Sequence, residues 1–366
     1  MKRVLQDGRG MALALTLVAL VIVGALVASA LFSGTAEQRM AENVRFGLQS
    51  FGVAEGAAYG ALGTWPANRS TYTGRRAYPL DSAVPMQTDG SYSGTVYRLS
   101  STLYLLDVTG RDIRSRADGL RDGISQRLGL LIRIAPLPAD IQAPLTTLDE
   151  SVTRGRRNTF LNGMDNPPPA GSNWSDCGPT GAGVAGVRST LDTNVLYRYG
   201  SSGYATLSQQ ASVQLAPGSY RPSPVVVSGV CETNAQPSNW GDGNDHRSPC
   251  GAYFPIVWLK GNPPFSATGT WSILGGQGQG VLLVDGDLSV QGPFTFYGLI
   301  VVRGTLSAAG NAALTVYGAV SARTADATDS GSGPITVNWS SCALTEALLG
   351  AGLGAPSRSR GWVQLY

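Results

Sequence analysis

A predominantly apolar stretch without charged side chains runs from Met11 to Phe32. At ~1.5 Å per residue, a helix of this length crosses a hydrocarbon core of ~30 Å, so the pattern predicts a membrane-spanning helix. Lys2, Arg3 and Arg9 precede the stretch, and the positive-inside rule therefore predicts a short cytoplasmic N-terminus and export of everything after Phe32. A cleaved secretory signal is the weaker interpretation, because the stretch is longer than a typical h-region.

A second pattern follows, in which apolar residues recur at the three- and four-residue steps of a helix with one buried face. Its members are Met40, Val44, Leu48, Phe51, Ala54, Ala58 and Leu62. The two patterns together predict one helix over residues 11–63, which would be ~75 Å long if unbroken. Its first half is apolar on all sides, and its second half requires a globular partner on one side.

Gly52, Gly56 and Gly60 form a line of small residues on this predicted helix. We favour packing of this line against the protein's own sheet, because close contact between a helix and a sheet can demand glycine. The alternative is contact with the helix of another subunit.

Two motifs carry a resemblance to a known family. Arg9-Gly10, directly before the apolar stretch, resembles the point at which a prepilin peptidase cuts a type IV prepilin. The polar segment after the stretch resembles PilX-type minor pilins, which carry an E-x-R-M-A-x-N-x-R signature and then an A-E-x-A box. The matching residues are Glu37, Arg39, Met40, Ala41, Asn43, Arg45, Ala54, Glu55 and Ala57.

The resemblance implies that Gly10 and Met11 form the processing site and that Met11 becomes the N-terminus, as a substrate for methylation. The segment from Met11 to Phe32 would lie in the inner membrane as a single pass and afterwards in the core of an extracellular filament. The fifth residue after the cut would be Leu15, where major pilins carry a glutamate that neutralises a neighbour's terminal amine. Leucine at this position indicates a minor subunit with a role in assembly or tip priming. The implied partners are other pilins and the prepilin peptidase.

Composition supports an exported protein. Only 14% of the residues are charged and 48 are glycine, which suits a secreted β-rich protein better than a cytosolic enzyme. The net charge of +3 is too mild to predict nucleic-acid binding. All four cysteines follow residue 170, which predicts disulfides in an oxidising compartment. Three pairings are possible; we prefer Cys231–Cys250 with Cys177–Cys342, and the sequence does not decide between them.

We predict an α+β fold in five parts: a prepilin leader at 1–10, the helix at 11–63, a pilin-like α/β head at 64–150, a loop-rich disulfide region at 151–250 and a β-solenoid-like domain at 251–366. In the head, residues 94–108 predict one long strand or a hairpin, and residues 107–112 resemble the turn that follows it. Residues 124–135 predict a further strand.

The C-terminal part contains a repeat that predicts a short parallel β-helix. The segment Asp285-Gly-Asp-Leu aligns with Arg303-Gly-Thr-Leu at a step of eighteen, and Phe296-Tyr-Gly aligns with Val316-Tyr-Gly at a step of twenty. Short strands that repeat near twenty residues with a glycine corner must stack on one another to bury their apolar sides. Residues 335–342 are expected to cap the stack. This part resembles, more loosely, the C-terminal regions of long PilX-like proteins and bactofilin-type solenoids.

Candidate chemistry is sparse, and we predict no catalytic residues, metal ligands or cofactors. Asp242, Asn244 and Asp245, with Glu232 nearby, meet a calcium-loop pattern only in part, and a capped turn is the favoured interpretation. His246 is interpreted as a loop residue. Asp285 and Asp287 lie on the same side of a predicted strand end, where capping of a turn is more usual than catalysis.

Two further groups are candidates for contacts with other molecules. One is a basic cluster of Arg111, Arg114, Arg116, Arg121 and Arg127, for which a solvated face is the default and an acidic partner or phospholipid headgroups the alternative. The other is aromatic and comprises Trp174, Trp240, Tyr253, Trp258, Trp271 and Trp339, which suit an interface or a core equally well.

The sequence therefore predicts a non-enzymatic minor pilin or pseudopilin of a type IV filament. The first alternative is a membrane- or pilus-anchored surface adhesin, whose head would bind a ligand. A carbohydrate-active enzyme on the β-helix ranks last, because no G-x-S-x-G, H-E-x-x-H or phosphate-loop motif occurs in the chain.

Overall fold

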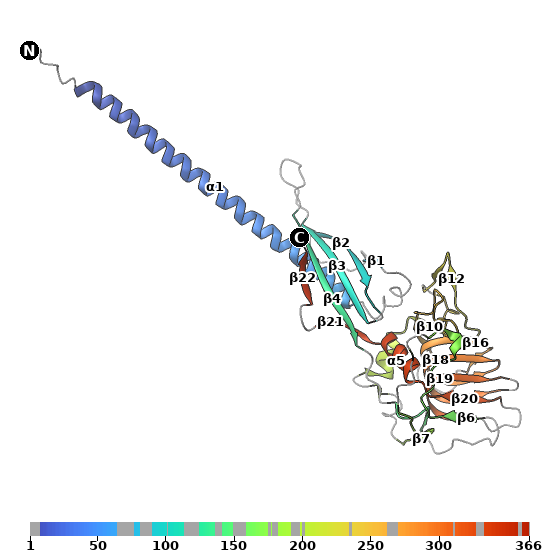
Figure 1. The fold of residues 1–366 in the computed structure, drawn as a ribbon. Coiled ribbons are helices and arrows are strands. Elements are labelled where there is room, and N and C mark those ends of the chain that lie inside the picture. Colours follow the sequence, from blue (N-terminus) through green and yellow to red (C-terminus); the bar gives the residue numbers. More distant parts are fainter. Residues whose placement is uncertain are drawn as a thin grey trace, which may run out of the picture.

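The computed structural model describes residues 8–63, 77–80, 90–100, 102–112, 124–135, 141–148, 159–174, 177, 182–191, 198–199, 202–233, 236–261, 270–309, 312–326, 333–357 and 361–365. The chain begins with one continuous helix, α1 (Gly8–Gly63), which projects far from the rest of the molecule (Figure 1). Its 56 residues correspond to ~84 Å, so the predicted helix is present and slightly longer than expected. It is long and apolar enough to cross a membrane.

The predicted buried face of α1 is wrong in its first half. Met40, Val44 and Leu48 are 69%, 58% and 68% exposed, whereas Ala54 and Ala58 are fully buried. The protein's own sheet first reaches the helix at Phe46 and Gly47, which are half-buried, and buries residues of the helix only from Ser50 onward. The predicted helix is therefore confirmed, but within one chain the sheet buries only the second half of the predicted apolar face.

An antiparallel sheet packs on this second half of α1. Its strands lie in the order β1-β2-β3-β4-β21, with β22 also paired to β4. The bounds are β1 (Ala77–Pro79), β2 (Gly90–Arg98), β3 (Leu103–Asp112), β4 (Ser125–Ala135), β21 (Leu353–Pro356) and β22 (Trp362–Leu365). The alternate residues Leu128, Leu130, Ile132 and Ile134 of β4 join the alanines of α1 in one core.

The head contains the predicted hairpin, but its expected turn is wrong. Residues 107–112 continue β3, because Asp107 pairs with Thr95 and Asp112 with Gly90. The Gly110 that suggested a turn is required by close packing: a Cβ at this position would collide with the Ser50 carbonyl of α1.

Strands from the end of the chain complete this antiparallel sheet. Leu353 pairs with Ala135, and Trp362 pairs with Leu130. Everything between β4 and β21 is therefore inserted into the head, and the last strands of the predicted solenoid-like region belong to the head sheet. Figure 1 shows the C-terminus beside α1.

The inserted part is built on a large sheet in which every strand pair is parallel. The paired segments form three stacks. The first contains residues 276–279 of β16, 294–297 of β18 and 314–317 of β19, followed by β20 and β6. The second contains β10, β14, residues 281–284 of β16, 299–302 of β18 and 319–322 of β19, followed by β5 and β7. The third contains β11, β15, β17 and the last residues of β18 and β19. The bounds are β5 (Leu145–Thr147), β6 (Thr159–Asn162), β7 (Val187–Ser189), β10 (Val213–Leu215), β11 (Ser219–Tyr220), β14 (Ile256–Leu259), β15 (Thr270–Ile273), β16 (Gly276–Val284), β17 (Asp287–Val290), β18 (Phe294–Ala308), β19 (Leu314–Asp326) and β20 (Ile335–Asn338).

The register of this sheet follows the two repeat steps. Leu288 pairs with Leu306, and Tyr297 pairs with Tyr317. The expected cap is wrong, because β20 lies between β19 and β6 rather than at the end. Strands β6 and β7, from the region predicted to be loop-rich, and β5, from the region assigned to the head, extend the sheet beyond β20 and β19.

Two helices cover one outer face of the parallel sheet, α4 (Tyr204–Gln209) and α5 (Ser341–Gly350). The remaining short elements are η2 (Ala170–Ser172) and the pairs β8 (Arg198–Tyr199) with β9 (Ser202–Gly203) and β12 (Val226–Val227) with β13 (Val230–Cys231). Most of the aromatic contact candidates are core residues: Trp174, Trp240, Tyr253, Trp271 and Trp339 are at most 9% exposed, and only Trp258 is half-buried.

Candidate functional site

The exposed side of α1 gathers the residues of the motif found in the sequence. Glu37, Arg39, Asn43 and Arg45 are exposed, and Glu55 is half-buried. Upstream of them, the apolar residues of the membrane-length segment are exposed as well; Leu15 is 68% and Phe32 is 76% exposed. Gly10 and Met11 lie in the first turns of the helix. The structure thus places these residues along one helix, and every described side chain from Ala12 to Arg45 is exposed.

A hollow on this surface is mostly apolar. It is lined by Glu37, Met40, Ala41, Val44, Arg45, Leu48 and Gln49. The methionine, valine and leucine lie four residues apart and so form one stripe, bordered by the charged Glu37 and Arg45. A stripe of this kind on an isolated helix is stable in water only when another apolar surface covers it.

The glycine line continues this exposed side, contrary to our favoured interpretation. A Cβ added at Gly52 or Gly56 would meet no atom within 4 Å, so neither glycine packs on the sheet. The sheet instead supplies the glycines of the contact, since a Cβ at Gly90 or Gly110 would collide with α1. Gly52 and Gly56 remain available for the close approach of another helix.

The inserted part is braced by two disulfides, Cys177–Cys342 and Cys231–Cys250, which is the pairing preferred from the sequence. The first joins segments 165 residues apart, directly at the start of α5. Asp165 fixes the same place, because its carboxylate accepts hydrogen bonds from the Ser341 backbone N–H at 2.9 Å and from the Ser341 hydroxyl at 2.5 Å.

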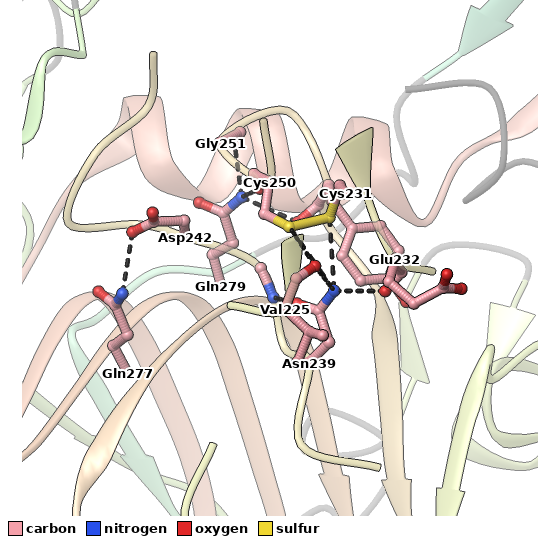
Figure 2. The surroundings of a disulfide bond; sticks show 11 residues. Val225, Cys231, Glu232, Asn239, Asp242, Cys250, Gly251, Gln277 and Gln279 are labelled. Atoms are coloured by element: carbon pink, nitrogen blue, oxygen red, sulfur yellow. Dashed lines mark hydrogen bonds between the residues drawn. A yellow bond between two sulfur atoms is a disulfide. The ribbon is translucent and has the colours of Figure 1, made fainter. Parts of the chain in front are cut away.

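The side chain of Asn239 lies beside the second disulfide, Cys231–Cys250 (Figure 2). Its Nδ2 donates to the Glu232 carbonyl at 2.6 Å and lies 3.4 Å from the Cys231 Sγ, and its Oδ1 accepts from the Gly241 backbone N–H at 3.1 Å. The side chain is 1% exposed. One buried amide therefore holds both arms of the 231–250 loop.

Two glutamines of β16 hold this loop against the parallel sheet (Figure 2). The Nε2 of Gln279 lies within hydrogen-bond distance of the carbonyls of Cys250, Gly251 and Tyr253, at 3.2, 2.8 and 2.8 Å. The Nε2 of Gln277 donates to the Asp242 carboxylate at 2.9 Å. That carboxylate also accepts from the Asp245 backbone N–H at 3.1 Å, so Asp242 caps a turn, as we favoured over calcium.

Replacing Gln279 by leucine is expected to lower the free energy of unfolding by about 3 kcal/mol, because three loop carbonyls lose a buried donor. Gln291→Leu is the matched control: this residue is exposed and its side chain donates one hydrogen bond, to the Ser272 hydroxyl at 3.1 Å, so a change below about 0.5 kcal/mol is expected. Urea unfolding followed by tryptophan fluorescence measures both values. Equal losses in the two variants would contradict this role of Gln279.

The other candidates have structural partners. The Asp285 carboxylate accepts from the Gly261 N–H at 2.9 Å and the Asp287 carboxylate from the Thr305 N–H of β18 at 2.7 Å, so both aspartates bind the backbone of a neighbouring segment. His246 stacks on Trp174, with ring centroids 4.7 Å apart. In the described parts of the chain, no group of three or more His, Cys, Asp or Glu side chains is placed to hold a metal ion.

The predicted basic cluster is described only in part, since Arg114, Arg116 and Arg121 lie outside the described residues. Arg127 forms a two-pronged ion pair with Asp107, with Nε–Oδ1 and Nη2–Oδ2 distances of 2.8 and 2.6 Å. This hydrogen-bonded pair raises the pKa of the Arg127 guanidinium. Arg127 therefore has its acidic partner on the neighbouring strand β3.

The sequence analysis missed Asn239, Gln277 and Gln279. The signal was present in the two glutamines, which occupy alternate positions of a strand whose later residues are all apolar. Nothing in the sequence connected either glutamine with a loop more than twenty residues away.

No protein-family model matches the chain, and no curated protein matches it. Among solved structures, the competence-associated pilin ComZ from Thermus thermophilus is similar at 12% identity and a TM-score of 0.23, over 87% of this chain and 96% of ComZ. A likeness this low supports no conclusion about fold or function.

Proposed function

We propose that the protein is a minor pilin of a type IV filament, with a structural role in assembly or tip priming. The observation that carries this proposal is α1. It is a single helix of 56 residues whose first half contains an exposed stretch without charges, from Ala12 to Phe32. The end of its second half is seated on a sheet, and an open apolar and glycine face lies on the opposite side. The exposed apolar segment of such a helix requires a membrane before assembly, and other helices must cover it after the protein has left the membrane.

The proposal includes processing and orientation. The prepilin peptidase would cut between Gly10 and Met11 on the cytoplasmic side, and the new N-terminus would be methylated. The protein would then be held by one pass in the inner membrane until it enters a filament of other pilins, with its head outside. Leu15 stands at the position where a major pilin carries a glutamate to neutralise the terminal amine of a neighbouring subunit. Leucine at this position supports a minor rather than a major pilin.

The architecture of the head is part of the proposal. We interpret the antiparallel sheet with α1 as the pilin-like head and the parallel sheet as a short β-solenoid inserted between β4 and β21. In-register parallel pairing across β16, β18 and β19 supports this interpretation, as do the positive φ angles of Gly280, Gly298 and Gly318 at one repeated corner. The role of this insertion is structural, without catalysis.

The experiment is a substitution on the open face of α1. Leu48→Glu is expected to lower the amount of this protein in sheared filaments by at least about tenfold, because a buried carboxylate in a helix–helix contact costs several kcal/mol. Leu99→Glu is the matched control, since Leu99 is 54% exposed but lies between two strands of the head. Equal incorporation of the two variants, at equal amounts in the membrane, would contradict the proposal.

A further inference from the structure

The side of α1 that faces away from the sheet carries both large apolar side chains and glycines. Ser50 is fully buried and marks the side that packs on the sheet. At ~100° per residue, four residues lie within about 60° of the line opposite Ser50, namely Val44, Leu48, Gly52 and Gly56. All four are exposed. We call this side of α1, over residues 37–56, the open side.

The apolar side chains and the glycines of the open side have the same spacing. Val44 and Leu48 are four residues apart, and Gly52 and Gly56 repeat this step eight residues further on. A second α1 that is parallel to the first and displaced by eight residues, ~12 Å, brings each glycine level with one of the two side chains. A Cβ at either glycine would meet no atom within 4 Å, so the space beside them is free. Helices approach closely where glycine faces a larger residue.

The same displacement brings opposite charges to one level. Arg45 follows Glu37 by eight residues, so the two are level in a displaced pair of helices. Glu55 follows Arg45 by ten residues and lies within ~3 Å of the level of the other arginine. Within the described ranges, none of these three side chains forms an ion pair or a side-chain hydrogen bond. Their own chain therefore leaves all three charges for a partner.

The positions of these charges around the helix select a parallel partner. Glu37 and Glu55 lie about 40° to one side of the line opposite Ser50, and Arg45 lies about 40° to the other side. Two parallel helices whose open sides meet bring opposite borders together, so the acidic border of each lies along the basic border of the other. An antiparallel pair brings like borders together. Charges that flank an apolar contact set orientation and partner choice in this way in coiled coils.

We propose that the open side of α1 binds the open side of a second copy of this chain, in parallel and displaced by eight residues. Val44 and Leu48 of one copy lie on Gly52 and Gly56 of the other. The inference rests on the proposed function, because it names one helix that covers α1 in the filament.

The two copies use different segments of the same side. One contributes residues 37–48 and its partner residues 45–56, so the contact is heterologous and each copy keeps one segment free for a further subunit. The contact does not involve Leu15, and its charge pairs therefore need no carboxylate at that position.

Reversal of single charges tests the displacement. In the full-length chain, a detergent micelle covers a segment of ~30 Å, Met11 to Phe32, and leaves residues 37–56 in water. Sedimentation equilibrium is expected to show self-association of the unmodified chain. Glu37→Arg or Arg45→Glu alone is expected to weaken it by about fivefold, because like charges then meet at one level. An equimolar mixture of the two variants is expected to restore it, since the reversed charges attract each other.

Two further variants locate the contact. Gly52→Leu is expected to weaken self-association by about tenfold, because the new side chain fills the space that Val44 occupies. Leucine has a higher helix propensity than glycine, so a weaker helix does not account for this loss. Oxidation of a mixture of Glu37→Cys and Arg45→Cys chains is expected to give about fivefold more linked dimer than either chain alone, because a disulfide needs Cα atoms at one level.

A chain that stays monomeric, a mixture of the charge variants no tighter than either variant alone, or equal cross-linking in the mixture and the single chains would overturn the proposal. The amount of the unmodified chain in sheared filaments tests the proposed function separately. A chain that is present in filaments and monomeric in detergent would refute self-association and leave the proposed function intact.

Discussion

A Gly10→Val chain is expected to remain uncut and to be absent from filaments. The resemblance in the sequence implies that the prepilin peptidase cuts after this glycine, and a branched side chain there blocks the cut. The uncut chain keeps Lys2, Arg3 and Arg9 directly before the apolar half of α1. Moving such charges into an apolar helix bundle costs several kcal/mol each, so the uncut protein stays in the membrane.

Gly8→Val is the control for this result. Gly8 and Gly10 both lie in the first turn of α1, so the same substitution alters the helix similarly at the two positions. Immunoblots of membrane and sheared-filament fractions measure both chains. Normal filament incorporation of the Gly10→Val chain, or equal loss in both variants, would contradict processing at Gly10.

Removal of the Cys177–Cys342 disulfide is expected to lower the free energy of unfolding by about 5 kcal/mol. This loss is larger than the one expected for the Cys231–Cys250 disulfide. The bond closes a loop of 165 residues, and in the chain-entropy model the stabilisation grows with loop length. It also joins the start of α5 to a distant segment, so its loss frees the helix that covers one face of the parallel sheet.

The matched control is the Cys231–Cys250 pair, replaced by serines in the same way. Its separation of 19 residues corresponds to about 3 kcal/mol. Urea unfolding of each double variant, followed by the fluorescence of the buried Trp240 and Trp271, gives the two losses. A larger loss for the Cys231–Cys250 pair would contradict this ordering.

The sequence predicted those elements whose pattern is local. The helix over residues 11–63 follows from its apolar composition and three- to four-residue period, and β4 from its β-branched and apolar run. The register of β18 on β19 follows from a repeated Tyr-Gly pair, because parallel stacking places equal residues over one another.

The remaining elements depend on contacts that leave no local signal. β5, β6 and β7 have three or four residues each and share no repeat with the strands that they extend. β21 and β22 return to a sheet formed more than two hundred residues earlier, and antiparallel pairing at that distance has no sequence period. The loop between Cys231 and Cys250 was predicted from its two cysteines. The sequence did not indicate that Gln277 and Gln279 hold this loop against the sheet.

The glycines show why one residue type alone is ambiguous. Gly52 and Gly56 on the helix, and Gly90 and Gly110 on the strands, all suit a close helix–sheet contact in the sequence. The structure assigns this contact to the strand glycines and leaves the helix glycines exposed. Only the rotation of α1 relative to the sheet decides between the two, and that rotation is set by Ser50, Val53 and Ala57 on the buried side.

The most direct test of the central claim is the mass of the N-terminal peptide of this protein, taken from sheared filaments. The proposed function predicts a chain that is present in the filaments and begins at Met11, with or without a methyl group. A chain that begins at Met1, or at Leu31 after Ala28-Ser29-Ala30, would contradict prepilin processing and leave a signal-anchored or secreted surface protein.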